Sequence, residues 1–261
     1  APTGQAAKRL GEACGAEAAT IHRLLETQFD RQTGQLVFAH DEDEPLAADA
    51  VIVDETSMVD VPLMRALLSA LRGDCRLILV GDPDQLPSVG PGNLLSDLLR
   101  SGRVPTVRLT EIFRQAAQSA IVRNAHSVDR GELPDLHNNQ PDFFFLRRKD
   151  PVRTAETIVE LVQTRLPKNM GIPADQIQVL SPTRKHQSGT FALNQRLQAA
   201  LNPPAQDKGE RRFGPYLFRL GDRVMQVKNN YDVMWKDREG RGAGLGGCNG
   251  DIGRSTDLDP R

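Results

Sequence analysis

The sequence predicts an α/β fold in which parallel strands alternate with helices. Two short runs, residues 50–53 and 76–80, are rich in Val, Ile and Leu; the first leads directly into Asp54-Glu55 and the second ends at Gly81-Asp82. Continuous runs of this kind are typical of strands buried on both faces of a parallel sheet. Amphipathic segments follow each run, and the repeated order of strand and helix is typical of a doubly wound sheet.

The first block of elements surrounds this sheet. Residues 4–14 space their apolar side chains for one face of a helix, and Thr20 can cap a second helix. Residues 29–40 contain two short strands around Thr33-Gly34, which indicates a hairpin. The other elements expected here are helices at 21–27, 61–72 and 91–101, and strands at 50–54, 76–80 and 106–109.

A second α/β block is predicted to begin near Ile112. After about residue 203 the composition of the chain changes, because Pro, Gly and charged residues become more frequent. Gly242 to Gly247 spell GAGLGG, but charged residues precede them and no helix follows, so we expect a flexible loop and not a dinucleotide site. The elements expected are helices at 116–130, 151–166 and 189–201, and strands at 142–146, 177–180, 216–220 and 223–228.

Composition describes an ordinary globular protein, with 39% hydrophobic and 26% charged residues. No apolar run approaches the roughly 20 residues that span a bilayer, and no signal peptide is visible. Cys14, Cys75 and Cys248 lie far apart, which supports neither a disulfide framework nor a zinc site and fits a cytoplasmic protein. Because Ala1 is followed directly by a turn and a helix, we expect a fragment whose first strand is missing.

The net charge of −1 conceals an asymmetry along the chain. Residues 41–60 carry acids and no Lys or Arg, whereas residues 181–241 carry a twofold excess of Lys and Arg over Asp and Glu. If the partner is a polyanion, this local excess of basic residues matters more for binding than the net charge does. The alternative is an ordinary solvated surface.

Three positions have the chemistry of a nucleotide-hydrolysing site. Asp54 and Glu55 follow the first strand, where Asp54 can hold Mg²⁺ through water and Glu55 can polarise the attacking water. Gln85 follows the second strand and can contact a terminal phosphate. Arg114 lies at the junction of the two blocks, as an arginine finger would. The alternatives are two solvated acids, an exposed Gln in a Pro-rich turn and a surface ion pair.

Taken together, several segments resemble superfamily-one DNA helicases of the RecD-like branch. DETSMVD (54–60) resembles their motif II, GDPDQLPSV (81–89) motif III and IFRQ (112–115) motif IV. APTGQAAKRL and TIHRLL resemble motif Ia and the DNA-contacting segment after it, and VLSPTRKHQSGTFALN resembles a DNA-contacting segment of the second motor domain. GDRVMQVKNNYD with CNGDIG resembles the opening of an SH3-like module.

The resemblance implies two RecA-like parallel-sheet domains of the P-loop NTPase type, both incomplete. The first would span residues 1–111 with a β-hairpin insertion at 29–47, the second would span 112–212, and residues 213–261 would begin the SH3-like module. The hairpin would be the strand-separating pin, or else a surface loop. The implied activity is ATP-driven 5′–3′ translocation on single-stranded DNA and duplex unwinding in recombination and repair.

The resemblance also assigns roles to individual residues. Asp54 would bind Mg²⁺, Glu55 would be the catalytic base, Gln85 would sense the γ-phosphate of ATP, and Arg114 would contact that phosphate. For His22, the alternative to a DNA contact is a structural role in its helix. Single-stranded DNA would be faced by Pro2, Thr3, Thr20, His22, Thr183, Arg184, Lys185, Gly189 and Thr190.

One departure limits these expectations. The phosphate-binding GxxxxGK[ST] loop is absent, since the chain contains no Gly-Lys dipeptide. The motifs that follow GDIG in the family are absent as well. We therefore expect this chain alone to be inactive as an ATPase.

The alternatives within the class are an exonuclease V alpha subunit with partner subunits, a standalone RecD-like helicase and the helicase part of a conjugative relaxase. From another class, the chain could be a non-catalytic DNA-binding or assembly module.

Overall fold

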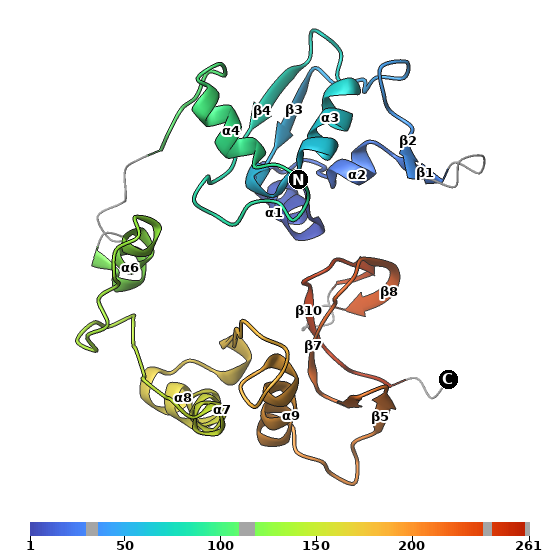
Figure 1. The fold of residues 1–261 in the computed structure, drawn as a ribbon. Helices are drawn as coiled ribbons and strands as arrows, with labels where there is room; N and C mark the ends of the chain where they lie inside the picture. The colour runs from blue at the N-terminus through green and yellow to red at the C-terminus, as the bar shows by residue number, and fades with distance from the viewer. Residues whose placement is uncertain (30–35, 110–117, 237–241, 259–261) are drawn as a thin grey trace. The chain divides into compact units, whose positions relative to one another are not determined.

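The computed structural model describes residues 1–29, 36–109, 118–236 and 242–258 (Figure 1). The chain divides into two compact units. The first comprises Ala1–Phe113 and Gln226–Asp251, and the second comprises Arg114–Met225 and Ile252–Arg261.

The core of the first unit lies on one face of a parallel strand pair. β3 (Ala50–Val53) pairs with β4 (Arg76–Leu79), and this pair together with the surrounding helices confirms the α/β class. Val51 and Val53 are buried against side chains of the helices α2 and α3, including Leu67. On the other face Ile52 and Ile78 are 48% and 42% exposed. The expected burial of these strands on both faces is therefore wrong for the described residues, because helices cover only one side.

The helices of this unit begin where capping side chains stand. Thr3, Thr20 and Asp60 each accept a hydrogen bond from a backbone N–H in the first turn of the next helix, as helix N-caps do. The bounds are α1 Gly4–Cys14, α2 Ile21–Leu24, the 3-10 turn η1 Thr56–Met58, α3 Val61–Ser69 and α4 Leu94–Ser101.

Three of these helices are shorter than expected, and α3 ends at Ser69 and not at residue 72. The helix expected at 21–27 ends at Leu24, because Thr27 enters a strand. α4 begins at Leu94 and not at residue 91, because the Pro91 carbonyl accepts from Val61 N and Gly92 has a positive φ of 95°.

The expected hairpin is confirmed by two antiparallel strands, β1 (Thr27–Phe29) and β2 (Leu36–Phe38). Thr33-Gly34 lies outside the described residues. The His22 ring of α2 lies 5.9 Å from the ring of Phe38, centroid to centroid, so the hairpin is in contact with this helix.

The glycine-rich segment near the C-terminus is a strand, which corrects the expected flexible loop. β9 (Ala243–Gly247) pairs antiparallel with β8 (Asn230–Lys236). A Cβ on Gly244 would lie 2.6 Å from a ring carbon of Trp235, the residue opposite it. The glycine is therefore explained by an aromatic ring lying on the backbone.

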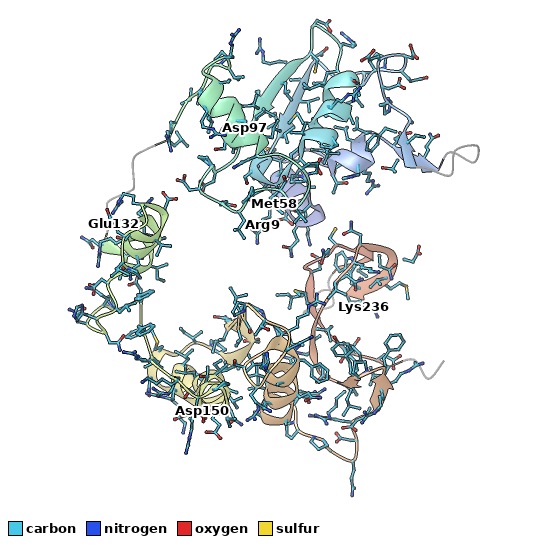
Figure 2. The ribbon with its side chains drawn as sticks, viewed as in Figure 1. Arg9, Met58, Asp97, Glu132, Asp150 and Lys236 are labelled. Atoms are coloured by element: carbon cyan, nitrogen blue, oxygen red, sulfur yellow. The ribbon has the colours of Figure 1, made fainter. Side chains whose placement is uncertain are left out.

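The second unit is built on packed helices. α7 (Pro151–Glu160), whose N-terminus Asp150 caps (Figure 2), continues through a π-helical turn η2 (Leu161–Arg165) into α8 (Leu166–Met170). α7 packs against α9 (Thr190–Leu201). The remaining helical elements of this unit are α6 Ala120–Asp129 and the 3-10 turn η3 Ala174–Gln176.

Three expected strands, residues 106–109, 142–146 and 177–180, are not strands. Side chains occupy backbone groups that a neighbouring strand would have bonded. Asn138 bonds both the N–H and the C=O of Phe145 (2.7 and 3.0 Å), and Arg223 donates to the Ile177 carbonyl at 2.8 Å. No parallel sheet forms in the part of this unit that the structure describes.

Two antiparallel ladders complete the second unit. β5 (Glu210–Phe213) pairs with β6 (Tyr216–Arg219), and β7 (Arg223–Met225) pairs with β10 (Ile252–Arg254). They confirm the two strands expected in this region, although β7 ends three residues earlier than expected. Among the described residues no helix is long and apolar enough to cross a membrane.

The start of α6 provides a pH-dependence prediction. Ser119 and the N–H of Ala120 both donate to the Asp142 carboxylate, and these hydrogen bonds, with that of Ser119 first, hold the pKa of Asp142 below its usual value. A lowered pKa stabilises the fold above the unfolded-state pKa, and that contribution is lost as pH falls through the folded-state pKa. We therefore expect the protection of the α6 amides against hydrogen exchange to decrease when the pH is lowered below about 4.

Hydrogen exchange of residues 120–124, expressed as protection factors at pH 7 and pH 3, measures this effect. Asp142→Asn is expected to lower the protection at pH 7 and to remove most of its acid dependence. Unchanged acid dependence in Asp142→Asn would contradict the prediction.

Candidate functional site

Asp54 and Glu55 form a tight turn at the carboxyl end of β3. The Asp54 Oδ1 atom accepts a hydrogen bond from the Glu55 N–H at 2.9 Å, and both side chains are half-buried. Glu55 has φ 56° and ψ 41°, in the left-handed region. For a residue other than Gly this conformation costs about 1–3 kcal/mol, and such strain concentrates at functional sites.

The next two residues anchor this turn. Thr56 is fully buried, its hydroxyl donates to the Val53 carbonyl at 3.1 Å, and its N–H donates to the Val80 carbonyl at 2.9 Å. The Ser57 hydroxyl is also buried and has no hydrogen-bond partner among the described residues. The ends of the two parallel strands are therefore joined directly, as ligand-binding edges of α/β sheets are.

Gly81 brings the following loop against this turn. A Cβ at this position would lie 2.9 Å from a methyl carbon of Leu95, 3.1 Å from Thr56 N and 3.2 Å from Ser57 N. No side chain larger than hydrogen fits without movement of the backbone.

Gln85 lies exposed in this loop, with its side chain held locally. Its Nε2 atom donates to Asp82 Oδ2 at 3.4 Å, and Asp82 Oδ1 also accepts from Asp84 N at 3.0 Å. The structure thus brings the Gln85 loop and the Asp54-Glu55 turn to one edge of the strand pair. In this conformation the Gln85 amide bonds Asp82.

A clamp that the residue-by-residue analysis missed joins this loop to α3. A Cβ on Gly90 would lie 1.9 Å from Asp60 Oδ2, and one on Gly92 would lie 2.5 Å from a Val61 methyl carbon. The Ser88 hydroxyl donates to the carbonyls of Gly90 and Gly92 at 3.1 and 3.0 Å. The sequence signals the two parts separately, an N-cap at Asp60 before Val61-Pro62 and a turn at PSVGPG, but it does not signal the contact between them.

The residues present suit one part of a metal–nucleotide site. Asp54 is a half-buried carboxylate at a strand end, which fits a hard cation held through water. Within the described ranges no group of three or more His, Cys, Asp or Glu could hold a metal ion by itself. The remaining ligands of a Mg²⁺ ion would have to be water and phosphate oxygens.

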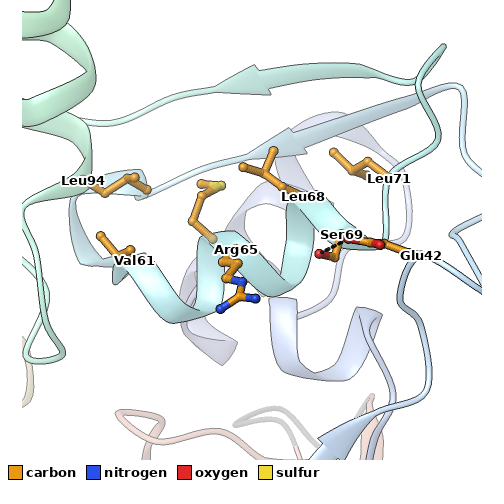
Figure 3. Close-up of a pocket in the computed structure, with 8 residues that line it drawn as sticks. Glu42, Val61, Arg65, Leu68, Ser69, Leu71 and Leu94 are labelled. Carbon is orange, nitrogen blue, oxygen red and sulfur yellow. Dashed lines mark hydrogen bonds between the residues drawn. The ribbon is translucent and has the colours of Figure 1, made fainter.

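A shallow hollow on α3 is separate from this edge. It is lined mostly by apolar side chains, with Arg65 projecting from the helix and Ser69 donating to Glu42 at 3.2 Å (Figure 3). None of the predicted site residues lines it.

The first group of predicted DNA-facing residues gathers where α1 and α2 begin. The Ala1 carbonyl accepts from Ile21 N at 2.9 Å, which places Pro2 and Thr3 beside Thr20. Burial lowers the pKa of the Ala1 amino group, and the charge of Asp54 partly opposes this shift. The hydroxyls of both threonines cap helices (N···O 3.3 Å each), so each already has a structural role.

The second group forms one loop in the second unit. The N–H groups of Thr190 and Phe191 donate to the carbonyls of Thr183 and Arg184 at 3.0 and 3.4 Å. A Cβ on Gly189 would lie 2.1 Å from the Lys185 carbonyl oxygen, so only glycine fits there. The loop therefore folds tightly onto the start of α9 and leaves the side chains of Arg184 and Lys185 exposed. Arg114, the remaining predicted residue, lies outside the described residues.

Two family models match the chain. Residues 1–156 match the AAA domain, and residues 193–261 match the SH3 domain of ATP-dependent RecD-like DNA helicases. The chain belongs to the AAA domain family, and it is similar to RecD-like helicases.

Relatives of the RecD-like type align with most of the chain. An ATP-dependent RecD2 DNA helicase of Deinococcus radiodurans is 39% identical over 89% of this chain and 30% of its own length. The RecBCD enzyme subunit RecD of Mycolicibacterium smegmatis is 44% identical over 89% of this chain and 45% of its own length. The chain therefore spans less than half the length of these RecD-like relatives.

The clamp provides the prediction for this site. We expect Gly90→Ala to destabilise the protein by roughly 1–3 kcal/mol, because an added methyl group would overpack the contact with Asp60. Thermal unfolding measures the effect. Gly73→Ala is the matched control, since a Cβ there would meet nothing within 4 Å. Equal melting temperatures for the two variants would disprove the clamp.

Proposed function

We propose that this chain is the part of an ATP-dependent DNA helicase that carries the acidic half of the ATPase site and two surfaces for single-stranded DNA. The observation that carries the proposal is the turn at Asp54-Glu55, which is held in a strained conformation and joined to the Gln85 loop through Thr56 and Gly81. Backbone strain retained at Glu55, beside a second carboxylate, is a feature of reactive sites more than of solvated surfaces.

Each residue of this edge has a defined role in the proposal. Asp54 holds Mg²⁺ through water, and the ion would neutralise charge on the phosphates of ATP. Glu55 accepts a proton from the attacking water, Gln85 leaves Asp82 to contact the terminal phosphate, and Arg114 contributes a positive charge to that phosphate. Family membership supports nucleotide and Mg²⁺ use.

The DNA-facing residues support backbone recognition independent of sequence. Pro2, Thr3, Thr20 and His22 form one surface, and Thr183, Arg184, Lys185, Gly189 and Thr190 form the other. Exposed Arg and Lys side chains bind phosphates without reading bases. Alternating movement of two such surfaces, driven by ATP hydrolysis, would move the protein along the strand, in the 5′–3′ direction that the resemblance implies.

The β1–β2 hairpin is proposed as the strand-separating pin. Its support is the contact between Phe38 and His22, which connects the hairpin to a predicted DNA-facing residue. The name of the mycobacterial relative, a subunit of the RecBCD enzyme, also supports assembly with other subunits.

A non-catalytic DNA-binding module is the second candidate, because the 261 residues contain no Gly-Lys dipeptide and by themselves support DNA binding more directly than hydrolysis. Without the phosphate-binding loop, neither its N–H groups nor its Lys would hold the β- and γ-phosphates. The two candidates agree on DNA binding and differ on hydrolysis.

One prediction of the proposed function concerns ATP hydrolysis by the chain alone. We expect the 261-residue chain to show little DNA-stimulated ATPase activity, because its own residues provide only the acidic half of the site. Phosphate release with and without oligothymidine measures this. Robust turnover that disappears in Glu55→Gln would contradict the expectation.

The natural polypeptide that carries this chain separates the two candidates. In it, Glu55→Gln is expected to lower DNA-stimulated hydrolysis by about 10²-fold or more, the range for loss of a general base. Glu12→Gln, which changes an exposed acid of α1, is the control and should have no effect. Absence of hydrolysis in the unsubstituted polypeptide would favour the non-catalytic module.

Another prediction of the proposed function concerns DNA binding. We expect the chain to bind single-stranded DNA weakly and with strong salt dependence, since Lys and Arg exceed acids in residues 181–241. Arg184→Ala and Lys185→Ala should each reduce the slope of log K against log salt by about 0.7. Lys149→Ala, an exposed lysine outside the predicted surfaces, is the control. Binding that does not change between about 50 and 200 mM salt would disprove the electrostatic account.

A further inference from the structure

We infer that Phe191, Phe213, Tyr216 and Phe218 form a platform on which bases of single-stranded DNA stack. This inference rests on the proposed function and extends it from phosphate contacts to base contacts. The four residues, called here the aromatic platform, are a third of the twelve aromatic residues of the chain.

The antiparallel register of β5 and β6 places three of these rings on one face of the hairpin. Phe213 lies opposite Tyr216, and Phe218 is two residues further along the strand. Residues opposite each other, and residues two apart, share a face of a sheet. The Phe191 ring, from the first turn of α9, lies 5.7 Å from the Tyr216 ring, which in turn lies 6.4 Å from the Phe218 ring.

The opposite face of this hairpin is already fixed to the protein. Gln198 of α9 donates to the Leu217 carbonyl at 2.9 Å, and the buried Arg219 side chain pairs with Glu210 and donates to the Asn202 carbonyl. The platform therefore faces outward, and its rings are 36% (Phe191), 73% (Phe213), 49% (Tyr216) and 36% (Phe218) exposed.

Charge favours nucleic acid over an apolar protein partner as the occupant. The platform adjoins the loop of Arg184 and Lys185, because the N–H of Phe191 donates to the Arg184 carbonyl. The two acids nearest in sequence to the β5–β6 rings already have partners within the protein. Glu210 pairs with Arg219. Asp222 accepts hydrogen bonds from Gln198, Asn202 and the Arg219 N–H. A basic loop beside exposed rings is the combination that binds single strands, with phosphates on the cations and bases on the rings.

The test separates base stacking from phosphate binding by using two probes of equal length, an oligothymidine and an oligomer of abasic spacers, at about 15 nucleotides. Fluorescence anisotropy of each probe with the 261-residue chain gives the affinity ratio. We expect the chain to bind oligothymidine at least about fivefold more tightly, the low end of one stacked base.

Tyr216→Leu retains an apolar side chain but removes the central aromatic face, which contacts the rings of Phe191 and Phe218, and it is expected to lower the ratio clearly without weakening binding of the abasic probe. Tyr216→Trp should preserve the ratio. Phe145→Leu, which removes an exposed ring elsewhere in this unit, is the matched control. Phe213→Leu, at the hairpin tip, provides the same test if the circular dichroism of Tyr216→Leu shows unfolding.

Each outcome decides the inference. Equal affinity of the unsubstituted chain for both probes would overturn the platform while leaving the proposed DNA function intact. Binding of neither probe would overturn both. A preference for oligothymidine that Tyr216→Leu and Phe213→Leu leave unchanged would overturn the inference, because the bases would then stack elsewhere.

Discussion

The candidate site depends on one backbone contact, the hydrogen bond from Thr56 N to the Val80 carbonyl. It joins the end of β3 to the end of β4 just beyond the parallel ladder, and Gly81 then packs where a Cβ would meet Thr56 N and Ser57 N. This contact holds the backbone after Glu55, and the hydrogen bond from Val80 N to the Val53 carbonyl holds it before Asp54, so the left-handed conformation of Glu55 can be retained at its cost of about 1–3 kcal/mol. The position of the Gln85 loop follows from the same contact.

Local sequence signals predicted the elements of this edge well. The N-cap residues Thr3, Thr20 and Asp60 mark helix starts through hydrogen bonds that span three residues, so no distant contact is needed to find them. The two strands could be found from apolar runs for the same reason. The clamp at Gly90 could not be predicted, since its cause is a contact with Asp60 thirty residues earlier. Glycine alone does not reveal which side chain excludes a Cβ.

Two of the three incorrect strand predictions, those at 142–146 and 177–180, share a physical cause. An apolar β-branched run is compatible with a strand, but a strand also needs backbone groups on a neighbour. At Phe145 the side chain of Asn138 bonds both backbone groups, and at Ile177 the Arg223 side chain bonds the carbonyl. Periodicity within a run cannot indicate such competition, because the competing side chain lies outside the run, seven residues away for Asn138 and 46 for Arg223. At Gly244 the opposite happened, since a loop was expected and a strand is found. The glycine there is explained by the Trp235 ring, which leaves no room for a Cβ.

The two predicted DNA surfaces share a constraint that limits what they can do. At both, the groups usually assigned to phosphate binding are already used within the fold. The hydroxyls of Thr3 and Thr20 cap helices, and the N–H groups of Thr190 and Phe191 bond the carbonyls of the preceding loop. Phosphate binding at the second surface must therefore come mainly from the side chains of Arg184 and Lys185. Two flexible cations hold a strand only weakly, because exposed charge pairs contribute little in water. A ring face adds an attraction that salt does not screen, and the platform beside these cations supplies it.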